Sequence, residues 1–83
     1  MTEPLWSEQA FDELMQLRQP LLRKIVEAVE MLGELPYLAS SVDHLSRWRK
    51  FPCRPYWIIY SILDDGSVYV RFLHHMKRGT YPW

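Results

Sequence analysis

The chain has 83 residues, a mass of 10.0 kDa and 48% hydrophobic residues, which is enough for one hydrophobic core but not for two. We therefore expect a single domain over residues 1–83, and a two-domain enzyme is excluded. Ten basic residues balance ten acidic ones, which argues against a uniformly basic nucleic-acid-binding protein.

The first elements in chain order are two helices. Apolar residues recur with helical spacing over residues 7–17, and Ser7 is placed to cap that helix at its N-terminus. A second helix is expected to begin at Pro20 and to end at Gly33 as its C-terminal cap. Residues 2–6 would form at most a short extra strand, which Pro4 weakens.

The period of the hydrophobic pattern changes from helical to alternating after a connection over residues 33–46. We expect three antiparallel strands over residues 47–51, 56–63 and 67–74. The first loop between them is marked by prolines, and the second is an Asp-Gly turn. The alternation in the last strand places Val68, Val70 and Phe72 on one face. The predicted fold is α+β, with an N-terminal helical hairpin packed on a small twisted antiparallel sheet.

The charges are divided unequally along the chain. Residues 1–43 contain three basic and eight acidic residues, whereas residues 44–83 contain seven basic and two acidic ones. An anionic ligand is therefore expected to bind the second half. The single cysteine, Cys53, excludes an internal disulfide and favours a reducing compartment. The sequence has no signal-peptide pattern and no long apolar run, so we expect a cytoplasmic protein without a membrane partner.

Residues 45–78 resemble the RelE/ParE superfamily of toxins from bacterial type II toxin–antitoxin modules. The resemblance rests on Arg-x-Phe-Pro at residues 49–52, Tyr-x-Ile-x-Tyr at 56–60, the Asp-Gly turn and Leu-His-His at 73–75. The two predicted helices extend it over nearly the whole chain. The resemblance implies the RelE/ParE-like fold and a growth-inhibiting toxin with a role in plasmid stabilisation. It also implies a cognate antitoxin that neutralises the toxin, and through which the complex would bind promoter DNA.

The superfamily has two principal mechanisms, which imply different targets for this chain. ParE-like members poison DNA gyrase without cutting RNA, whereas RelE-like members cleave mRNA on the ribosome. We favour ParE-like inhibition of gyrase, because Phe51-Pro52 and the Leu73-His74 ending resemble that group. The alternatives are a RelE-like endoribonuclease and an inactive family member that acts only as a binding protein. Whether the chain is an enzyme depends on this choice, and neither mechanism implies a cofactor or a metal.

The RelE-like alternative implies a set of catalytic residues, because metal-free RNA cleavage needs groups that transfer protons and neutralise charge on the phosphorane. The matching positions are Lys50, Lys77, Arg78 and Tyr81. Trp57 departs from the pattern, since it occupies the position of an arginine, and an indole cannot neutralise an anion.

Further residues are candidates for contacts with a target or an antitoxin. The target-binding candidates are Arg49, Arg54, Arg71, His74 and His75. Arg71 has an alternative role in an ion pair with an acidic residue of the helices or of the antitoxin. Adjacent histidines in a strand point to opposite faces, which argues against a shared metal. Trp6 and Trp83, near the chain ends, are expected to bind the antitoxin. The aromatic residues of the strands are expected in the core, with stacking on nucleic-acid bases as the alternative.

Overall fold

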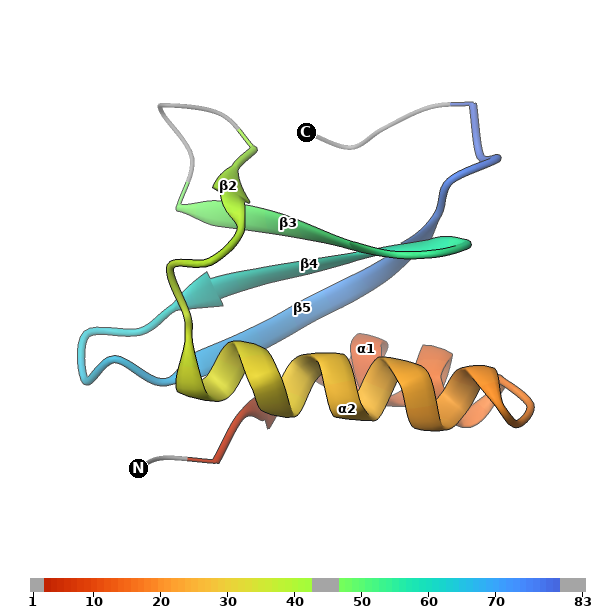
Figure 1. Ribbon diagram of the computed structural model, residues 1–83, viewed down its shortest axis with the longest axis horizontal. Coiled ribbons are helices and arrows are strands. Elements are labelled where there is room, and N and C mark those ends of the chain that lie inside the picture. Colours follow the sequence, from red (N-terminus) through yellow and green to blue (C-terminus); the bar gives the residue numbers. More distant parts are fainter. Residues whose placement is uncertain (1–2, 43–46, 80–83) are drawn as a thin grey trace.

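The computed structural model describes residues 3–42 and 47–79, and it contains two helices beside a five-stranded sheet (Figure 1). In chain order the elements are β1 (Leu5–Trp6), α1 (Glu8–Met15), α2 (Leu21–Glu34), β2 (Ser40–Ser41), β3 (Trp48–Cys53), β4 (Tyr56–Ile62) and β5 (Val68–His75). The order of strands in the sheet is β1-β5-β4-β3-β2. The predicted α+β class is therefore confirmed.

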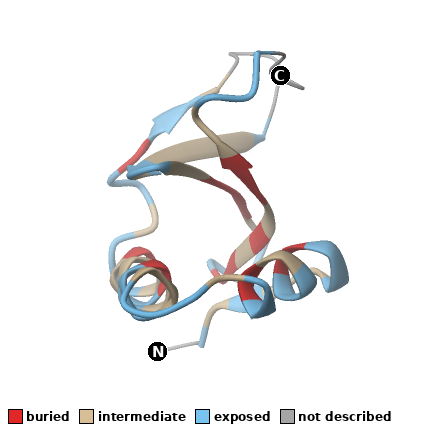
Figure 2. Cartoon of the chain, turned by 90° about the vertical axis from the view of Figure 1, so that its right-hand side faces the viewer, coloured by how far each residue is buried: buried red, intermediate tan, exposed pale blue. Residues whose placement is uncertain are grey.

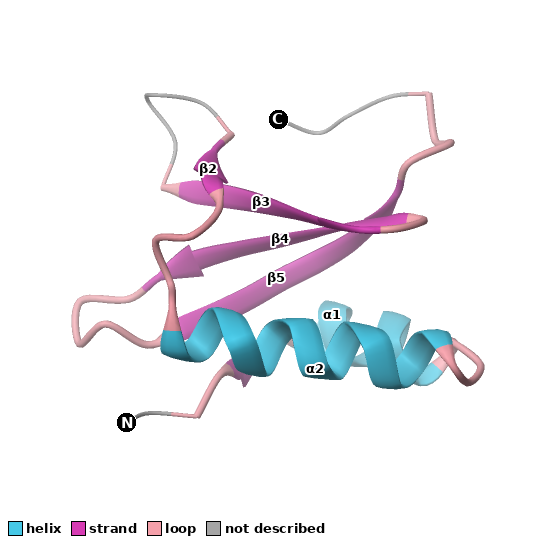
Figure 3. Cartoon of the chain, viewed as in Figure 1, coloured by secondary structure: helices cyan, strands magenta, loops and turns pink. Residues whose placement is uncertain are grey.

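The sheet is mixed rather than purely antiparallel. β3, β4 and β5 pair antiparallel as predicted, but β1 pairs with β5 in parallel. The two-residue strand β2 pairs with β3 and was not expected within the 33–46 connection. Both short strands lie at the sheet edges, at opposite sides of the three long strands (Figure 3).

The helices bury the apolar positions that their periodicity indicates. The Ser7 side chain accepts a hydrogen bond of 2.9 Å from the Ala10 amide, which confirms the predicted cap of α1. The core combines both helices with the facing side of the sheet. Its most buried members are Ala10, Leu14, Ile25, Val29, Leu32, Ile58, Tyr60, Val68, Val70 and Leu73.

Gly33 lies inside α2, so its prediction as the C-terminal cap is wrong. The helix continues to Glu34, and Leu35 is the capping residue. Gly33 instead permits a close approach of the N-terminal segment. A Cβ atom at this position would lie 2.8 Å from Cγ of Pro4. The missing side chain thus makes room for the residues that lead into β1.

Replacing Gly33 with alanine is expected to destabilise the fold by about 1 kcal/mol. Alanine gains about 1 kcal/mol of helix propensity, but the clash with Pro4 costs about 1–3 kcal/mol unless the segment moves. Urea unfolding measures the difference. The double variant Pro4→Ala/Gly33→Ala should recover stability, because it removes the ring that clashes. A Gly33→Ala protein as stable as the wild type would contradict this close packing.

A β-bulge changes the alternation of β5. Ile59 pairs with Phe72 and Tyr60 pairs with Val70, so Arg71 is an extra residue on β5. Beyond the bulge Leu73, not Phe72, joins Val68 and Val70 in the core. The predicted placement of Phe72 with the two valines is therefore wrong, because one inserted residue exchanges the faces of all those that follow.

Pro52 belongs to β3 rather than to the loop in which we expected it. It pairs with Trp57, and the β3–β4 connection contains only Arg54 and Pro55. The Val42 amide donates to the Trp48 carbonyl, so alternate residues of β3, Pro52 included, direct their backbone groups away from β4. Proline has no N–H group to offer there, which protects this part of the edge from pairing with another strand.

Helix α1 covers the outer edge of β5. The Ser7 hydroxyl donates to the Arg71 carbonyl at 2.6 Å, and the Glu13 carboxylate accepts from the Leu73 amide at 2.9 Å. These two bonds satisfy hydrogen-bonding groups of the β5 backbone that lie past the residues paired with the short strand β1. Both helices lie on the same side of the sheet (Figure 2).

Candidate nucleic-acid interface

The sheet face opposite the helices, here called the open face, carries basic and aromatic side chains. The pairing registers place Trp48 with Ser61, Lys50 with Ile59, and Trp57 with His74 on this face. Tyr69, Arg71 and Phe72 extend it across β5. Ile59 is fully buried yet lies outside the core cluster, so neighbouring side chains of the open face cover it.

Lys50 lies at the centre of β3 and contacts Trp57 of the adjacent strand. The Lys50 Nζ atom is 4.9 Å from the centroid of the Trp57 ring, a cation–π geometry. We call Lys50, Trp57 and His74 the Lys50 site. It places a cation beside an aromatic ring, the combination that single-stranded nucleic acids bind through their phosphates and bases.

His74 completes the Lys50 site but is only 2% exposed. Burial lowers the pKa of His74 below its ordinary value of 6.5, and the positive charge of Arg78 lowers the pKa further. His74 therefore stays neutral near pH 7 and lies beside Trp57, its partner across the β4–β5 pair. In the isolated chain its ring is not available for direct contact with a target.

The lowered pKa of His74 predicts a pH dependence of stability. The unfolded chain takes up a proton near pH 6.5, whereas the folded chain resists it, so this contribution to stability is complete above pH 6.5 and declines below it. We expect the stability difference between the wild type and His74→Gln to shrink as the pH falls from 7.5 to 5. Urea unfolding at several pH values measures it, and a constant difference would contradict the assignment.

Arg71 lies between two aromatic rings on the open face. Its guanidinium carbon is 5.5 Å from the centroid of the Trp48 ring and 5.4 Å from that of Tyr69. Its Nη1 atom donates to Ser61 Oγ at 3.2 Å. We call these four residues the Arg71 site. The contacts of Arg71 among the described residues are these rather than an ion pair with a helical carboxylate, which was one of its alternative roles.

Three predicted target-binding residues lie away from the open face. Arg49 donates to the Ala39 carbonyl at 2.6 Å and lies 4.9 Å from the centroid of the Tyr37 ring, so it anchors the connection after α2. Arg54 is exposed in the β3–β4 turn. His75 packs against Tyr56 on the helix side, with the ring centroids 5.0 Å apart. The two histidines thus point to opposite faces, as predicted.

The residues that follow β5 include two further basic side chains. Lys77 and Arg78 are exposed, and the positive charge of Arg78 adds to burial in lowering the pKa of His74. Tyr81 and Trp83 lie outside the described residues.

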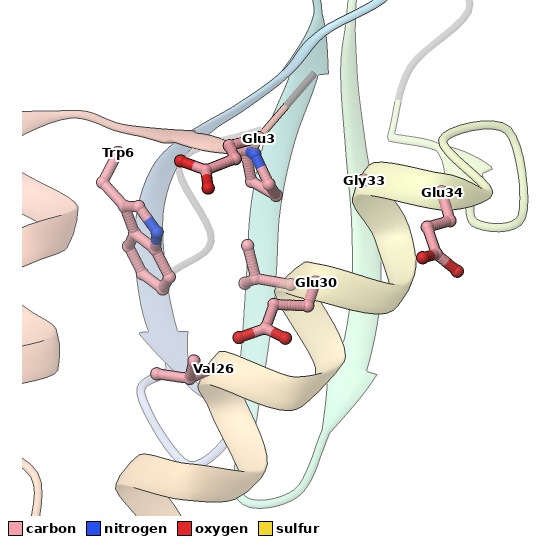
Figure 4. A pocket seen from close by; sticks show the side chains of 8 residues that line it. Glu3, Trp6, Val26, Glu30, Gly33 and Glu34 are labelled. Carbon is pink, nitrogen blue, oxygen red and sulfur yellow. The ribbon is translucent and has the colours of Figure 1, made fainter. Parts of the chain in front are cut away.

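Trp6 lines a groove between β1 and α2 on the helix side of the molecule. The groove has a volume of about 460 Å³, and its walls include Pro4, Trp6, Val26, Val29 and Gly33 with Glu3, Glu30 and Glu34. Figure 4 shows that Trp6 points from β1 into the same opening as Val26 and Glu30 from α2. The groove is therefore apolar with acidic side chains, in contrast to the open face.

The expectation that the strand aromatics lie in the core is right for two of them and wrong for Trp48, Trp57 and Tyr69. Tyr56 and Tyr60 contribute to the core, as expected, whereas Trp48, Trp57 and Tyr69 lie on the open face. Sequence reasoning did not single out Ser61, which hydrogen-bonds Arg71. The only available signal was that Ser61 interrupts the apolar run of β4.

Two further observations concern the described residues as a whole. Neither described helix is long and apolar enough to cross a membrane. Residues 3–42 and 47–79 contain no cluster of three histidine, cysteine, aspartate or glutamate side chains suited to hold a metal ion.

Comparison with known proteins links this fold to toxins. A family model described as the ParE toxin of the type II toxin–antitoxin system, parDE, matches residues 5–79. A chain of the intact Escherichia coli RelBE toxin–antitoxin complex superposes with a TM-score of 0.79 at 18% identity, covering 94% of this chain and 100% of that one. The isolated E. coli RelE toxin gives 0.80 at 17% identity, covering 95% and 88%. These likenesses show a shared fold. No curated protein sequence matches this one.

Proposed function

Because this chain belongs to the ParE toxin family of type II toxin–antitoxin systems, we propose that it is a toxin whose target is RNA, and that it cleaves mRNA on the ribosome. The sequence analysis favoured gyrase. The chemistry of the open face and the structural likeness to RelE instead support the RNA-directed alternative.

The observation that carries this proposal is the Lys50 site. A lysine ammonium group and an indole ring lie in contact on a sheet face that neither described helix covers. The Arg71 site places a second cation between two aromatic rings on the same face. Cations contact phosphates and rings stack on unpaired bases, so this face suits a single strand better than a duplex.

The reaction that fits these groups is cleavage without a metal. The ribose 2′-hydroxyl gives its proton to Lys77 or Tyr81 as the base, and its oxygen attacks the adjacent phosphorus. The bond from phosphorus to the 5′-oxygen then breaks, and the departing oxygen takes up a proton from the other of these two groups. Lys50 would neutralise charge on the phosphorane. Trp57 would hold a base by stacking, in place of the charge that an arginine supplies. Lys77 and Tyr81 are the proposed proton-transfer groups, and Arg78 is an additional cation.

The test is to add the purified chain to a translation reaction with a defined mRNA and to map the 5′ ends of the RNA fragments. Cuts that require both the toxin and translating ribosomes would support the proposal. Intact mRNA at toxin concentrations that stop growth in cells would overturn it.

Inhibition of gyrase is the second candidate, favoured by Trp57. An indole in the arginine position removes one charge from the reaction centre, and the matched family model is the ParE toxin. Measuring plasmid supercoiling in cells that express the toxin distinguishes gyrase inhibition from mRNA cleavage. Loss of supercoiling with intact mRNA would assign the toxin to gyrase. If expression changes neither growth, supercoiling nor mRNA integrity, the chain would be an inactive family member that only binds its partner.

We further propose that a cognate antitoxin occupies the groove at Trp6. The groove combines apolar walls with Glu3, Glu30 and Glu34, so a basic amphipathic segment fits it best. Trp6→Ala should weaken co-purification of the antitoxin by at least about tenfold. Unchanged co-purification would exclude this groove. Trp83, which the sequence also suggests for antitoxin contact, remains a proposal.

A further inference from the structure

The bulge in β5 produces a feature that a regular strand would not have. It inserts Arg71 as an extra residue and brings Phe72 onto the open face beside it. Phe72 packs edge-on against Trp48, with the ring centroids 5.4 Å apart. Trp48 is thus held in place by Phe72 on one side, while its ring also contacts the Arg71 guanidinium.

Two hollows flank this pair of side chains. The first, of about 460 Å³, is lined by Arg47, Trp48, Ser61, Ile62, Leu63, Asp64 and Arg71. The second, of about 300 Å³, is lined by Ser7, Gln9, Trp48, Tyr69, Arg71 and Phe72. Trp48 and Arg71 line both, so together they form the partition between two neighbouring hollows.

The groups around the partition suit a nucleotide on each side. The guanidinium has five N–H donors, and the bond from Nη1 to Ser61 uses one of them, so the group has further donors to offer a ligand. Arg47 adds a second cation to the larger hollow, and Tyr69 adds a ring and Gln9 an amide to the smaller one. Bases stack on such rings and on guanidinium planes, and phosphates pair with the cations.

We propose that the Arg71 site binds two successive nucleotides of single-stranded RNA, one in each hollow, with their connecting phosphate on Arg71. This inference rests on the proposed action on RNA and assigns a second contact to it, separate from the Lys50 site. Arg71 is here a binding residue and takes no part in proton transfer. An acidic peptide would use the charge of Arg71 but would gain little from Trp48 and Tyr69.

The test is fluorescence anisotropy of labelled hexauridylate RNA with the full chain. Arg71→Gln should weaken binding by about tenfold and reduce the slope of log affinity against log salt by about 0.7. Arg71→Lys should keep the slope but still bind several-fold more weakly, because lysine lacks the planar fork. Trp48→Leu should weaken binding by about 5-fold to 100-fold. Thermal unfolding of each variant verifies that it is folded.

Two variants on the helices provide matched controls. Arg23→Gln removes the same charge from an exposed position of α2, and Phe11→Leu removes an exposed ring from α1. Both should bind within twofold of the wild type. If these controls lost as much RNA affinity as the Arg71 and Trp48 variants, binding would depend only on general charge and hydrophobicity. That result would refute the proposed Arg71 site.

The remaining outcomes separate this inference from the proposed function. Wild-type affinity in both Arg71→Gln and Trp48→Leu, or no binding of hexauridylate by the wild type, would overturn the Arg71 site even if mRNA is cut on the ribosome. Competition by an acidic peptide with no effect of Trp48→Leu would also overturn it. The expected losses of affinity without any mRNA cleavage would uphold the site and refute only the reaction.

Discussion

Replacing Lys50 with alanine is expected to reduce mRNA cleavage by at least about 100-fold, the usual effect of removing a group that stabilises charge in a transition state. This effect is expected because Lys50 Nζ lies 4.9 Å from the centroid of the Trp57 ring on the open face. A base stacked on Trp57 would place its phosphate next to this ammonium group. The measurement is the rate of appearance of 5′ ends in a translation reaction.

The control for this variant is Lys24→Ala, which makes the same change at an exposed position of α2. It should cleave at the wild-type rate. Lys50→Arg should recover part of the activity, because it restores the charge with a different shape. Cleavage by Lys50→Ala within threefold of the wild type would remove Lys50 from the reaction. Growth inhibition that persists in this variant, together with lost supercoiling, would favour gyrase as the target.

Replacing Leu32 with alanine is expected to have the largest effect on stability, about 2–5 kcal/mol. Leu32 is 0% exposed and packs in the cluster that α2 forms with the sheet. Truncation leaves a cavity that the surrounding strands cannot close. Since a domain of this size is only marginally stable, a large part of the protein should be unfolded at 37 °C. Urea unfolding at 25 °C measures the change.

The same substitution at Leu38 is the matched control. Leu38 is 55% exposed in the connection after α2, so truncating it should change the free energy of unfolding by no more than about 0.5 kcal/mol. If both variants lost the same stability, the core assignment of Leu32 would be refuted. An antitoxin that binds only the folded state would add the same free energy to both proteins, so its addition should raise the folded fraction of Leu32→Ala more than that of the wild type.

The Arg71 site illustrates how one inserted residue changes which side chains lie together on the open face. Strict alternation from Val68 assigns Phe72 to the core and Leu73 to the other face. The bulge reverses both, and it leaves Arg71 and Phe72 together beside Trp48. A bulge depends on which residue of β4 faces which residue of β5, so the sequence of β5 alone does not reveal it.

The features that depend on neighbouring residues could be predicted from the amino-acid sequence. The two helices, the Ser7 cap, the three long strands and the turn at Gly66, where φ is 89°, all follow from spacing and from local backbone preferences. The charge division of the chain also reappears in space, as an acidic groove at Trp6 and a basic open face.

The contacts between distant segments, in contrast, depend on packing in three dimensions. The parallel pairing of β1 with β5, the approach of Pro4 to Gly33 and the inclusion of Pro52 in β3 depend on contacts between residues far apart in the chain. The same is true of neighbouring Arg49 and Lys50, of which one anchors a connection and the other faces outward. Local preferences act over a few residues, whereas strand register and close approach are fixed by packing of the whole domain.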